Sequence, residues 1–277
     1  MNTRPELAVP ETLEGWAVLH QIFHVDWPAW NRESAEARRT AEKEAVAFLR
    51  EVFKPGEGHG ACFSLLGHKG DLFLLHFRKT FDELNGVELG LQKLALSRFL
   101  KLSDSYVSVL ELGLYEMTVK LQRELLAQGL APDSEEWQAK WRESVAVERN
   151  KMDGRLHPAI PPDRYMCFYP MDKKRGETKN WYEIPIERRQ MMMRDHGMIG
   201  RKYSGRVTQI ITGSIGFDDW EWGVYLFAAD PVVFKKLVYE MRFDEASAAY
   251  AVFGPFVTGL QFAPENLPEF LSGKSPK

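Results

Sequence analysis

The sequence is poor in cysteine, in long apolar runs and in any leader-like segment. Two cysteines, Cys62 and Cys167, cannot make the disulfide framework of a small secreted domain. Apolar runs such as 61–67 and 72–77 are far shorter than the roughly 20 residues that a membrane-spanning helix needs. The N-terminus lacks the continuous apolar stretch of a signal peptide. We therefore expect a cytoplasmic protein without a membrane span.

The chain also lacks an excess of basic residues. Its formal net charge is -3 and its pI is about 6.2, whereas nucleic-acid-binding domains carry a marked basic surface. We expect no nucleic-acid partner, and a short basic cluster such as 173–175 needs a local explanation. The sequence is rich in apolar residues, since 44% of its 277 residues are hydrophobic. That amount supports one large domain or two of ordinary size.

The first part of the chain alternates between strand-like and helix-like patterns. β-Branched and aromatic runs predict strands, and apolar residues at helical spacing predict helices. In chain order we expect a strand, a helix, two strands, a helix and a strand at residues 16–25, 35–53, 61–67, 72–78, 81–99 and 106–112. This order is βαββαβ, the pattern of a ferredoxin-like unit.

The second part repeats the same order after a helical connector. The connector is expected to contain helices over 115–128 and 134–150. It is followed by a strand, a helix, two strands, a helix and a strand at residues 164–171, 187–202, 206–213, 221–228, 230–240 and 250–257. We predict an α+β fold in which two ferredoxin-like βαββαβ halves pack sheet against sheet in a dimeric α+β barrel. The expected parts are 1–114, the connector 115–160, and 161–277.

A phenol, a thioether and an ammonium group follow one another along one face of a predicted strand. Because side chains alternate along a strand, Tyr169, Met171 and Lys173 point to the same side. The plain alternative is a buried aromatic residue followed by a solvated basic turn. The pattern alone does not decide between a site and a turn, so the residues around it matter.

Several longer strings accompany this row, and together they resemble the chlorite dismutase family. The resemblance is closest to its coproheme decarboxylases of the tyrosine-using kind, and it covers about residues 164–260. The strings are Asn180-Trp181-Tyr182, His196-Gly197, Gly200-Arg201-Lys202-Tyr203, Thr212-Gly213-Ser214, Glu221-Trp222-Gly223-Val224, Arg242-Phe243-Asp244 and Ser247-Ala248. The fold that this resemblance implies agrees with the one predicted from periodicity.

The resemblance makes His196 the proximal iron ligand. A histidine near the end of a helix is more commonly a surface or capping residue, and no second metal ligand follows at a chelating spacing. A porphyrin iron already has four nitrogen ligands, so one axial side chain is sufficient. The other histidines fall outside the matched strings and are taken as structural.

The resemblance places Gln209 on the opposite, distal side of the iron. The plain alternative is a polar side chain on the solvent face of its strand. Chlorite-degrading relatives have an arginine there, whose fixed charge helps to retain an anionic oxidant, and a neutral amide cannot supply that charge. The residue therefore favours the use of peroxide over the use of chlorite.

Coproheme has four propionates, so its binding site needs cations and hydroxyl groups. By resemblance the contacts come from Arg155, Tyr169, Lys173, Arg201 and Ser247, with Met171, Trp181 and Gln209 completing the substrate site. Each of these residues, taken alone, is more often an ordinary structural or surface residue. The family often has Ser-Asn-Tyr where this chain has Gly113-Leu114-Tyr115, which puts one outer carboxylate contact near Leu114 in doubt.

The resemblance implies oxidative decarboxylation. Peroxide oxidises the bound iron porphyrin, which oxidises Tyr169 to a radical that takes hydrogen from a propionate, while Lys173 steers the carboxylate and moves protons. Coproheme is then both substrate and redox cofactor, and haem b is the product. The implied partners are hydrogen peroxide, further copies of the chain in a homopentamer, and a transient coproporphyrin ferrochelatase. The rival readings are a chlorite dismutase, a general peroxidase, and a haem carrier without chemistry.

Overall fold

The computed structural model describes residues 9–56, 58–132 and 134–277. The first half of the chain has the predicted order of strands and helices, with two short turns of helix added. Its elements are β1 (Thr12–Val25), α1 (Trp27–Arg32), α2 (Ala35–Val52), β2 (Gly58–Leu66), β3 (Leu72–Arg78), α3 (Phe81–Gln92), the 3-10 turn η2 (Ala95–Phe99) and β4 (Leu100–Gly113). The helix expected over 81–99 is therefore shorter than predicted, and η2 takes up its second part.

The second half also follows the predicted order, except at its end. Its elements are α4 (Tyr115–Ala127), α5 (Glu135–Leu156), β5 (Tyr165–Lys173), η3 (Trp181–Glu183), α6 (Ile186–Arg201), β6 (Thr208–Gly213), β7 (Trp222–Ala228), α7 (Val232–Met241), α8 (Glu245–Ala248), β8 (Ala251–Phe253), β9 (Val257–Phe262), η4 (Pro264–Asn266) and α9 (Leu267–Leu271). The single strand predicted over 250–257 is wrong. Gly254 and Pro255 interrupt it, because proline has no N–H for a strand ladder, and the chain continues as β9.

The strands close into a ring. Each half has the ferredoxin-like strand order, β4-β1-β3-β2 in the first and β9-β5-β7-β6 in the second, and all the pairings are antiparallel. The halves join edge to edge, where β2 pairs with β9 and β4 pairs with β6. Gly213 lies at the second junction, where a Cβ would fall 2.1 Å from Oε2 of Glu111, so a larger residue there would require the Glu111 side chain to move.

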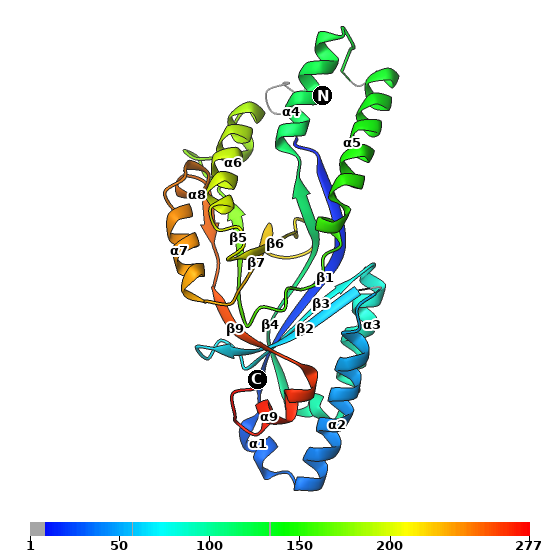
Figure 1. Cartoon of the computed structure of the whole chain (residues 1–277), viewed down its shortest axis with the longest axis vertical. Helices are drawn as coiled ribbons and strands as arrows, with labels where there is room; N and C mark the ends of the chain where they lie inside the picture. The colour runs from blue at the N-terminus through cyan, green and yellow to red at the C-terminus, as the bar shows by residue number, and fades with distance from the viewer. Residues whose placement is uncertain (1–8, 57, 133) are drawn as a thin grey trace.

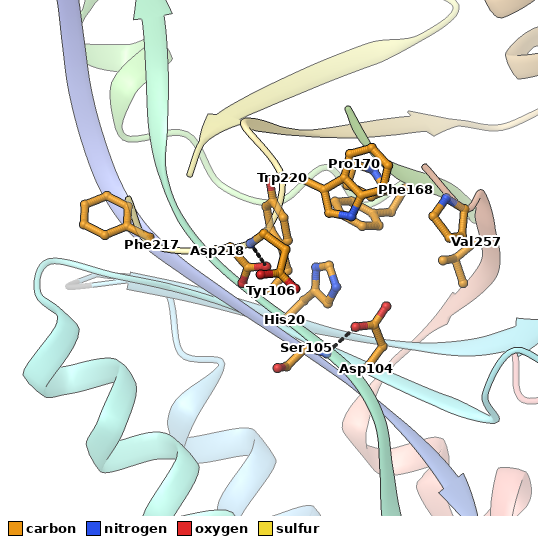
Figure 2. A pocket seen from close by; sticks show the side chains of 12 residues that line it. His20, Asp104, Ser105, Tyr106, Phe168, Pro170, Phe217, Asp218, Trp220 and Val257 are labelled. Atoms are coloured by element: carbon orange, nitrogen blue, oxygen red, sulfur yellow. Dashed lines mark hydrogen bonds between the residues drawn. The ribbon is translucent and has the colours of Figure 1, made fainter. Parts of the chain in front are cut away.

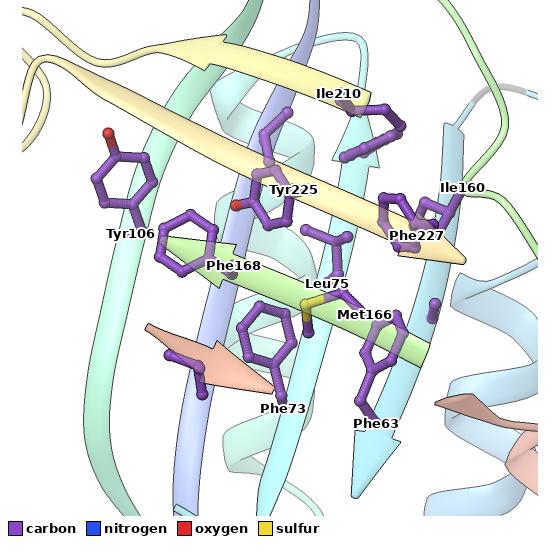
Figure 3. Close-up of a cluster of buried hydrophobic side chains, with 14 of the residues drawn as sticks. Phe63, Phe73, Leu75, Tyr106, Ile160, Met166, Phe168, Ile210, Tyr225 and Phe227 are labelled. Carbon is purple, nitrogen blue, oxygen red and sulfur yellow. The ribbon is translucent and has the colours of Figure 1, made fainter. Parts of the chain in front are cut away.

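Large apolar side chains fill the inside of this ring. Phe63, Phe73 and Leu75 come from the first half, and Phe168 and Phe227 face them from the second (Figure 3). All five are at most 2% exposed. The inner faces of the two halves thus share one core, as the prediction of sheet packed against sheet requires.

The helices lie outside the ring. In Figure 1, α2 and α3 cover the first half and α6 and α7 lie on a different side, against the second. Their apolar faces pack on two separate outer cores, one around Leu49, Leu74 and Leu91 and one around Leu226 and Leu237. The connector helices α4 and α5 run side by side and extend away from the strands.

We expect Phe227→Ala to destabilise the chain strongly. Phe227 is fully buried in the inner core, so its truncation leaves a cavity there and should lower the free energy of unfolding by about 3–5 kcal/mol. The matched control is Phe243→Ala, because Phe243 is 73% exposed and its loss should change stability by no more than about 0.5 kcal/mol. Urea unfolding followed by circular dichroism measures both. Equal effects would contradict the shared core.

Candidate active site

Strand β5 turns one face to the inner core and the other to the helices, and Tyr169 lies on the helix side. Its ring belongs to the outer core under α7 and stacks on Phe256 with centroids 4.5 Å apart. Phe253 lies on another side of the ring at 5.7 Å. The side chain is 5% exposed, so the phenol is held in a fixed orientation by aromatic contacts.

The surroundings of Tyr169 keep its hydroxyl protonated. Burial raises the pKa of the phenol well above its usual value, and the nearby Cys167 adds to this effect. The guanidinium of Arg242 acts in the opposite direction but does not outweigh burial. The residue therefore keeps its phenolic hydrogen at any ordinary pH, and it can give that hydrogen up only together with an electron.

Lys173 ends the same strand, and its ammonium group is buried. Nζ donates a hydrogen bond to the carbonyl oxygen of Ala246 at 3.0 Å and lies 4.3 Å from the centre of the Trp181 ring. Burial lowers the pKa of Lys173 to about 8, although the carboxylates of Asp244 and Glu221 partly offset this effect. An amine with this pKa can both donate and accept a proton near neutral pH.

The basic cluster that includes Lys173 surrounds a hollow in the surface. Lys173, Lys174, Arg175 and Lys179 line a cavity of about 350 Å³. The cluster that the sequence left unexplained is therefore the positively charged rim beside Lys173. A carboxylate or another small anion is the kind of group that such a rim attracts.

His196 lies on α6 and is oriented by a carboxylate from the start of α8. Nδ1 of His196 is 2.9 Å from Oδ2 of Asp244, and the Ser247 hydroxyl donates to the same oxygen at 3.1 Å. Burial would raise the pKa of Asp244, but the hydrogen bonds from His196 and Ser247 outweigh it and lower the pKa. The charged carboxylate thus accepts a hydrogen bond from Nδ1–H of His196, which leaves the lone pair of the ring on Nε2.

His196 and Gln209 lie near each other on the helix side of β6. Nε2 of His196 is the kind of nitrogen that can bind iron. Gln209 faces the same helix from β6, because its Nε2 is 3.7 Å from the place of a Cβ on Gly200. The iron-ligand role of His196 and the distal role of Gln209 stay predictions.

The other predicted residues differ in how closely the structure joins them to this group. Met171 packs beside Tyr169, Trp181 lies under the Lys173 ammonium, and Ser247 contacts Asp244 and His196. Arg201 is exposed at the end of α6. Arg155 is exposed on α5, where its Nη1 lies 3.5 Å from Sδ of Met152, so its role as a carboxylate ligand stays a prediction.

Leu114 and Tyr115, at the departure from the family pattern, lie at the start of α4. The Tyr115 ring is 6.5 Å from the Trp181 ring, and burial raises the pKa of its phenol. Tyr115 therefore brings a protonated hydroxyl to the neighbourhood of Trp181, although Leu114 itself has no polar side chain.

Three charged residues of this region received no role from sequence reasoning. Asp244 orients His196, Arg242 acts on the Tyr169 phenol, and Glu221 acts on Lys173. Asp244 could be recognised as a helix N-cap, since it precedes the short run Glu245–Ala248 and accepts from the Ser247 N–H. Its contact with a histidine 48 residues earlier has no local pattern in the sequence.

A second cavity, of about 400 Å³, lies on the inner side of β5 and is separate from this group. Figure 2 shows His20 in this cavity, among Asp104, Tyr106 and Phe168. Burial lowers the pKa of His20 to about 3, and its Nδ1 is 2.8 Å from the hydroxyl of Tyr225. His20 is thus a neutral core residue, which agrees with the structural role expected for it.

Comparison with known proteins gives a consistent result. The sequence model of the family described as chlorite dismutase matches residues 38–262. A coproheme decarboxylase of Staphylococcus carnosus is 43% identical over 263 residues, covering 94% of this chain and 97% of the relative. Relatives from Natronomonas pharaonis and Haloquadratum walsbyi, whose names describe them as heme-binding proteins, are each 42% identical. The chain spans only 42% and 48% of their lengths.

Solved structures show the same fold. A heme-binding protein from Thermus thermophilus is 41% identical, with a TM-score of 0.80 over 95% of this chain and 99% of that protein. A chlorite dismutase from Candidatus Nitrospira defluvii has a TM-score of 0.70 over 94% of this chain and 97% of its own, but only 17% identity, so it supports the fold alone.

We expect Lys173→Met to stabilise the chain at neutral pH. The pKa of Lys173 is about 8 in the folded chain against 10.5 as the ordinary value, so the charged form destabilises the fold below pH 8. That penalty disappears as pH rises from about 8 to 10.5. The substitution should therefore add on the order of 1–3 kcal/mol at pH 7, and the gain should shrink at high pH.

Urea unfolding across this pH range measures the gain. Lys174→Met is the matched control. Lys174 is only half-buried, so the gain in this variant should show no such pH dependence. A Lys173→Met variant that is less stable than the parent at pH 7 would contradict the proposed cost of burying the ammonium.

Proposed function

Because the chain belongs to the chlorite dismutase family, we propose that it converts two propionates of iron-coproporphyrin III (coproheme) into vinyl groups with hydrogen peroxide, giving haem b. The observation that carries this proposal is the pairing of a buried phenol, Tyr169, with a buried amine, Lys173, on one strand, while an oriented histidine lies on the neighbouring helix. Each step consumes one peroxide and one propionic acid group and yields a vinyl group, carbon dioxide and two waters.

In this proposal His196 binds the iron of coproheme through Nε2. The Asp244 carboxylate keeps the proton on Nδ1, so the lone pair stays on the other nitrogen and the ring keeps its orientation. When bound, the iron porphyrin supplies the oxidising power of peroxide. Gln209 faces the opposite side with a neutral amide, which can hydrogen-bond to peroxide but provides no positive charge for chlorite.

Tyr169 and Lys173 perform the chemistry on the propionate. The Tyr169 phenol keeps its hydrogen until it is oxidised, and the resulting radical takes hydrogen from the propionate carbon. Loss of carbon dioxide and of one further electron leaves the vinyl group. The Lys173 ammonium binds the carboxylate and moves protons, which suits a pKa of about 8. One such tyrosine must serve both propionates, so we propose that the macrocycle reorients between the two steps.

The remaining carboxylate contacts come from the rim of the site. We assign Arg155, Arg201 and Ser247 to carboxylates, and Met171 and Trp181 to the macrocycle beside the reacting groups. Ser247 already donates to Asp244, so a propionate would have to share or replace that bond. We propose residues 1–114 as scaffold and subunit interface, 115–160 as connector and 161–277 as the porphyrin-binding part.

Partners and location follow the same proposal. We propose a homopentamer that receives coproheme from a coproporphyrin ferrochelatase in the cytoplasm. Among the described residues no helix is long and apolar enough to cross a membrane. The four carboxylates of coproheme make the substrate soluble in water, so its binding site need not lie in a membrane.

Chlorite dismutation is the principal alternative, followed by a carrier role. Gln209 disfavours the first, because the amide cannot hold an anionic oxidant as an arginine does. The buried Lys173 disfavours a carrier role. A carrier needs no amine with a pKa near neutral pH, and burying the amine lowers the stability of the fold without any benefit to a carrier.

We expect Tyr169→Phe to abolish vinyl formation while leaving coproheme binding intact. Phenylalanine keeps the ring and its stacking on Phe256 but has no phenolic hydrogen to lose. Mass spectrometry of the porphyrin before and after peroxide titration measures this directly, because each conversion removes a carboxyl group. Lys173→Ala should be milder at the first propionate and should accumulate the product with one vinyl group and three propionates.

Two results would contradict the proposed function, and a third would contradict only the proposed mechanism. Unchanged coproheme after peroxide treatment of the parent protein would indicate a carrier, and sustained oxygen release from chlorite would indicate a chlorite dismutase. Haem b formation by Tyr169→Phe at the parent rate would indicate a decarboxylation that does not use the tyrosine.

We expect His196→Ala to remove the axial ligand without emptying the site. The ferric Soret band and the spin state should change because the nitrogen ligand is lost, while the carboxylate contacts retain part of the affinity. Absorption and electron paramagnetic resonance spectra of the coproheme complex measure the change. An unchanged spectrum would reject His196 as the ligand.

A further inference from the structure

Glu221 is a buried carboxylate that the proposed reaction does not use. It precedes the first residue of β7, and its side chain is 9% exposed. Glutamate is almost never buried this far unless it is paired, because its charge loses the stabilisation that water provides. Its partners should therefore indicate what the residue does.

The partners of Glu221 converge on the end of β5. Oε2 accepts a hydrogen bond from the backbone N–H of Lys173 at 2.7 Å, and Oε1 is 3.6 Å from Nε of Arg175. The Tyr182 hydroxyl bonds to the same carboxylate. In return, the Glu221 N–H donates to Oδ1 of Asp172 at 2.8 Å. Glu221 thus holds the neighbouring strand end through both its side chain and its backbone.

These hydrogen bonds of Glu221 lie where the pairing of β5 with β7 ends. The register of β5 against β7 ends at the pair Met171 and Trp222. On its other side Lys173 is opposite Ala251 of the short strand β8. The backbone amide of Lys173 therefore depends on the Glu221 carboxylate for the support that β7 no longer gives.

Two negative charges act on the Lys173 ammonium. Asp244 comes from the start of α8 and Glu221 from the segment before β7, while Trp181 of η3 offers only its ring. Arg175 lies on the same side as Glu221 and pairs with it. Asp244 is also hydrogen-bonded to His196 and Ser247. Glu221 has no such bond to His196, so its effect on Lys173 can be changed separately.

We propose that Glu221 is the positioning residue for Lys173: its carboxylate fixes the backbone from which the amine projects and places a negative charge beside that strand end. The inference deepens the proposed decarboxylation and rests on it for its role in catalysis. Its electrostatic part concerns only the chain itself, so it can be tested without porphyrin or peroxide.

We expect Glu221→Gln to move the titration midpoint of Lys173 downward. Glutamine retains an oxygen that can accept from the Lys173 N–H, but it removes the negative charge. The midpoint should fall by about one pH unit. Competitive acetylation of the full-length protein with acetic anhydride at pH 6–10, read by mass spectrometry of the Lys173 peptide, measures it, because only the neutral amine reacts.

The controls separate charge from structure. Glu177→Gln removes an equal charge from the neighbouring hairpin, where the side chain is exposed, and should leave the midpoint in place. Glu221→Asp keeps the charge and should restore most of the parent midpoint. Arg175→Gln removes the exposed cation beside Glu221 and should raise the midpoint, which gives a second test if Glu221→Gln does not fold.

Activity gives the catalytic consequence. With a midpoint lowered by one unit, the protonated fraction of Lys173 falls about fivefold at pH 8 and hardly changes at pH 6. Decarboxylation by Glu221→Gln should therefore be near the parent rate at pH 6 and about fivefold slower at pH 8.

An unchanged Lys173 midpoint in Glu221→Gln, or an equal shift in Glu177→Gln, would overturn the inference. So would an equal loss of activity at both pH values, since a purely structural role predicts it. Failure of the parent protein to decarboxylate coproheme at any pH would instead refute the proposed function, and the acetylation midpoints would still report on Glu221.

Discussion

The packing of large apolar side chains inside the strand ring is the interaction on which the rest of the structure depends. Phe63, Phe73, Phe168 and Phe227 are at most 2% exposed there, and a cavity of about 400 Å³ lies beside His20 and Phe168. Helices cover the outer faces of both halves through apolar residues, α2 and α3 on the first half and α6 and α7 on the second. His196, Gly197 and Gln209 lie on the second of these faces, between β6 and α6. The porphyrin site that we propose is on that face.

Strand β5 faces the inner core on one side and the candidate site on the other. Burial of polar groups on the second side disfavours their charged forms. Phe168 points to the inner core and stabilises the fold, whereas Tyr169 and Lys173 point outward into surroundings that disfavour their charged forms. The same desolvation that destabilises the charged amine prevents ionisation of the phenol. A phenol that stays protonated and an amine with a pKa of about 8 thus have the same physical cause, the burial of each group. The buried ammonium lowers the stability of the fold below pH 8.

Periodicity in the sequence predicts most of the fold but not its closure. The order of strands and helices follows from spacing alone, and the errors lie where local breakers act, at Gly254 and Pro255 and at the transition into η2. Ring closure depends on a contact between β4 and β6 that is only two residue pairs long and joins residues more than 100 positions apart in the chain. The row of Tyr169 and Lys173 is visible in strand alternation. The partners Asp244 and Glu221 are not, since they arrive from other segments.

The four-residue helix α8 joins the two sides of the candidate site. Its N-cap, Asp244, binds Nδ1 of His196, and the carbonyl oxygen of Ala246 accepts from the Lys173 ammonium. Ser247, in the same helix, bonds to the cap and lies 3.4 Å from the histidine. A shift of this helix would displace the His196 imidazole and the Lys173 amine together. The relative position of these two groups is therefore set by one short helix rather than by the long path through the sheet, and the Glu221 carboxylate holds the backbone N–H of Lys173 at the adjoining strand end.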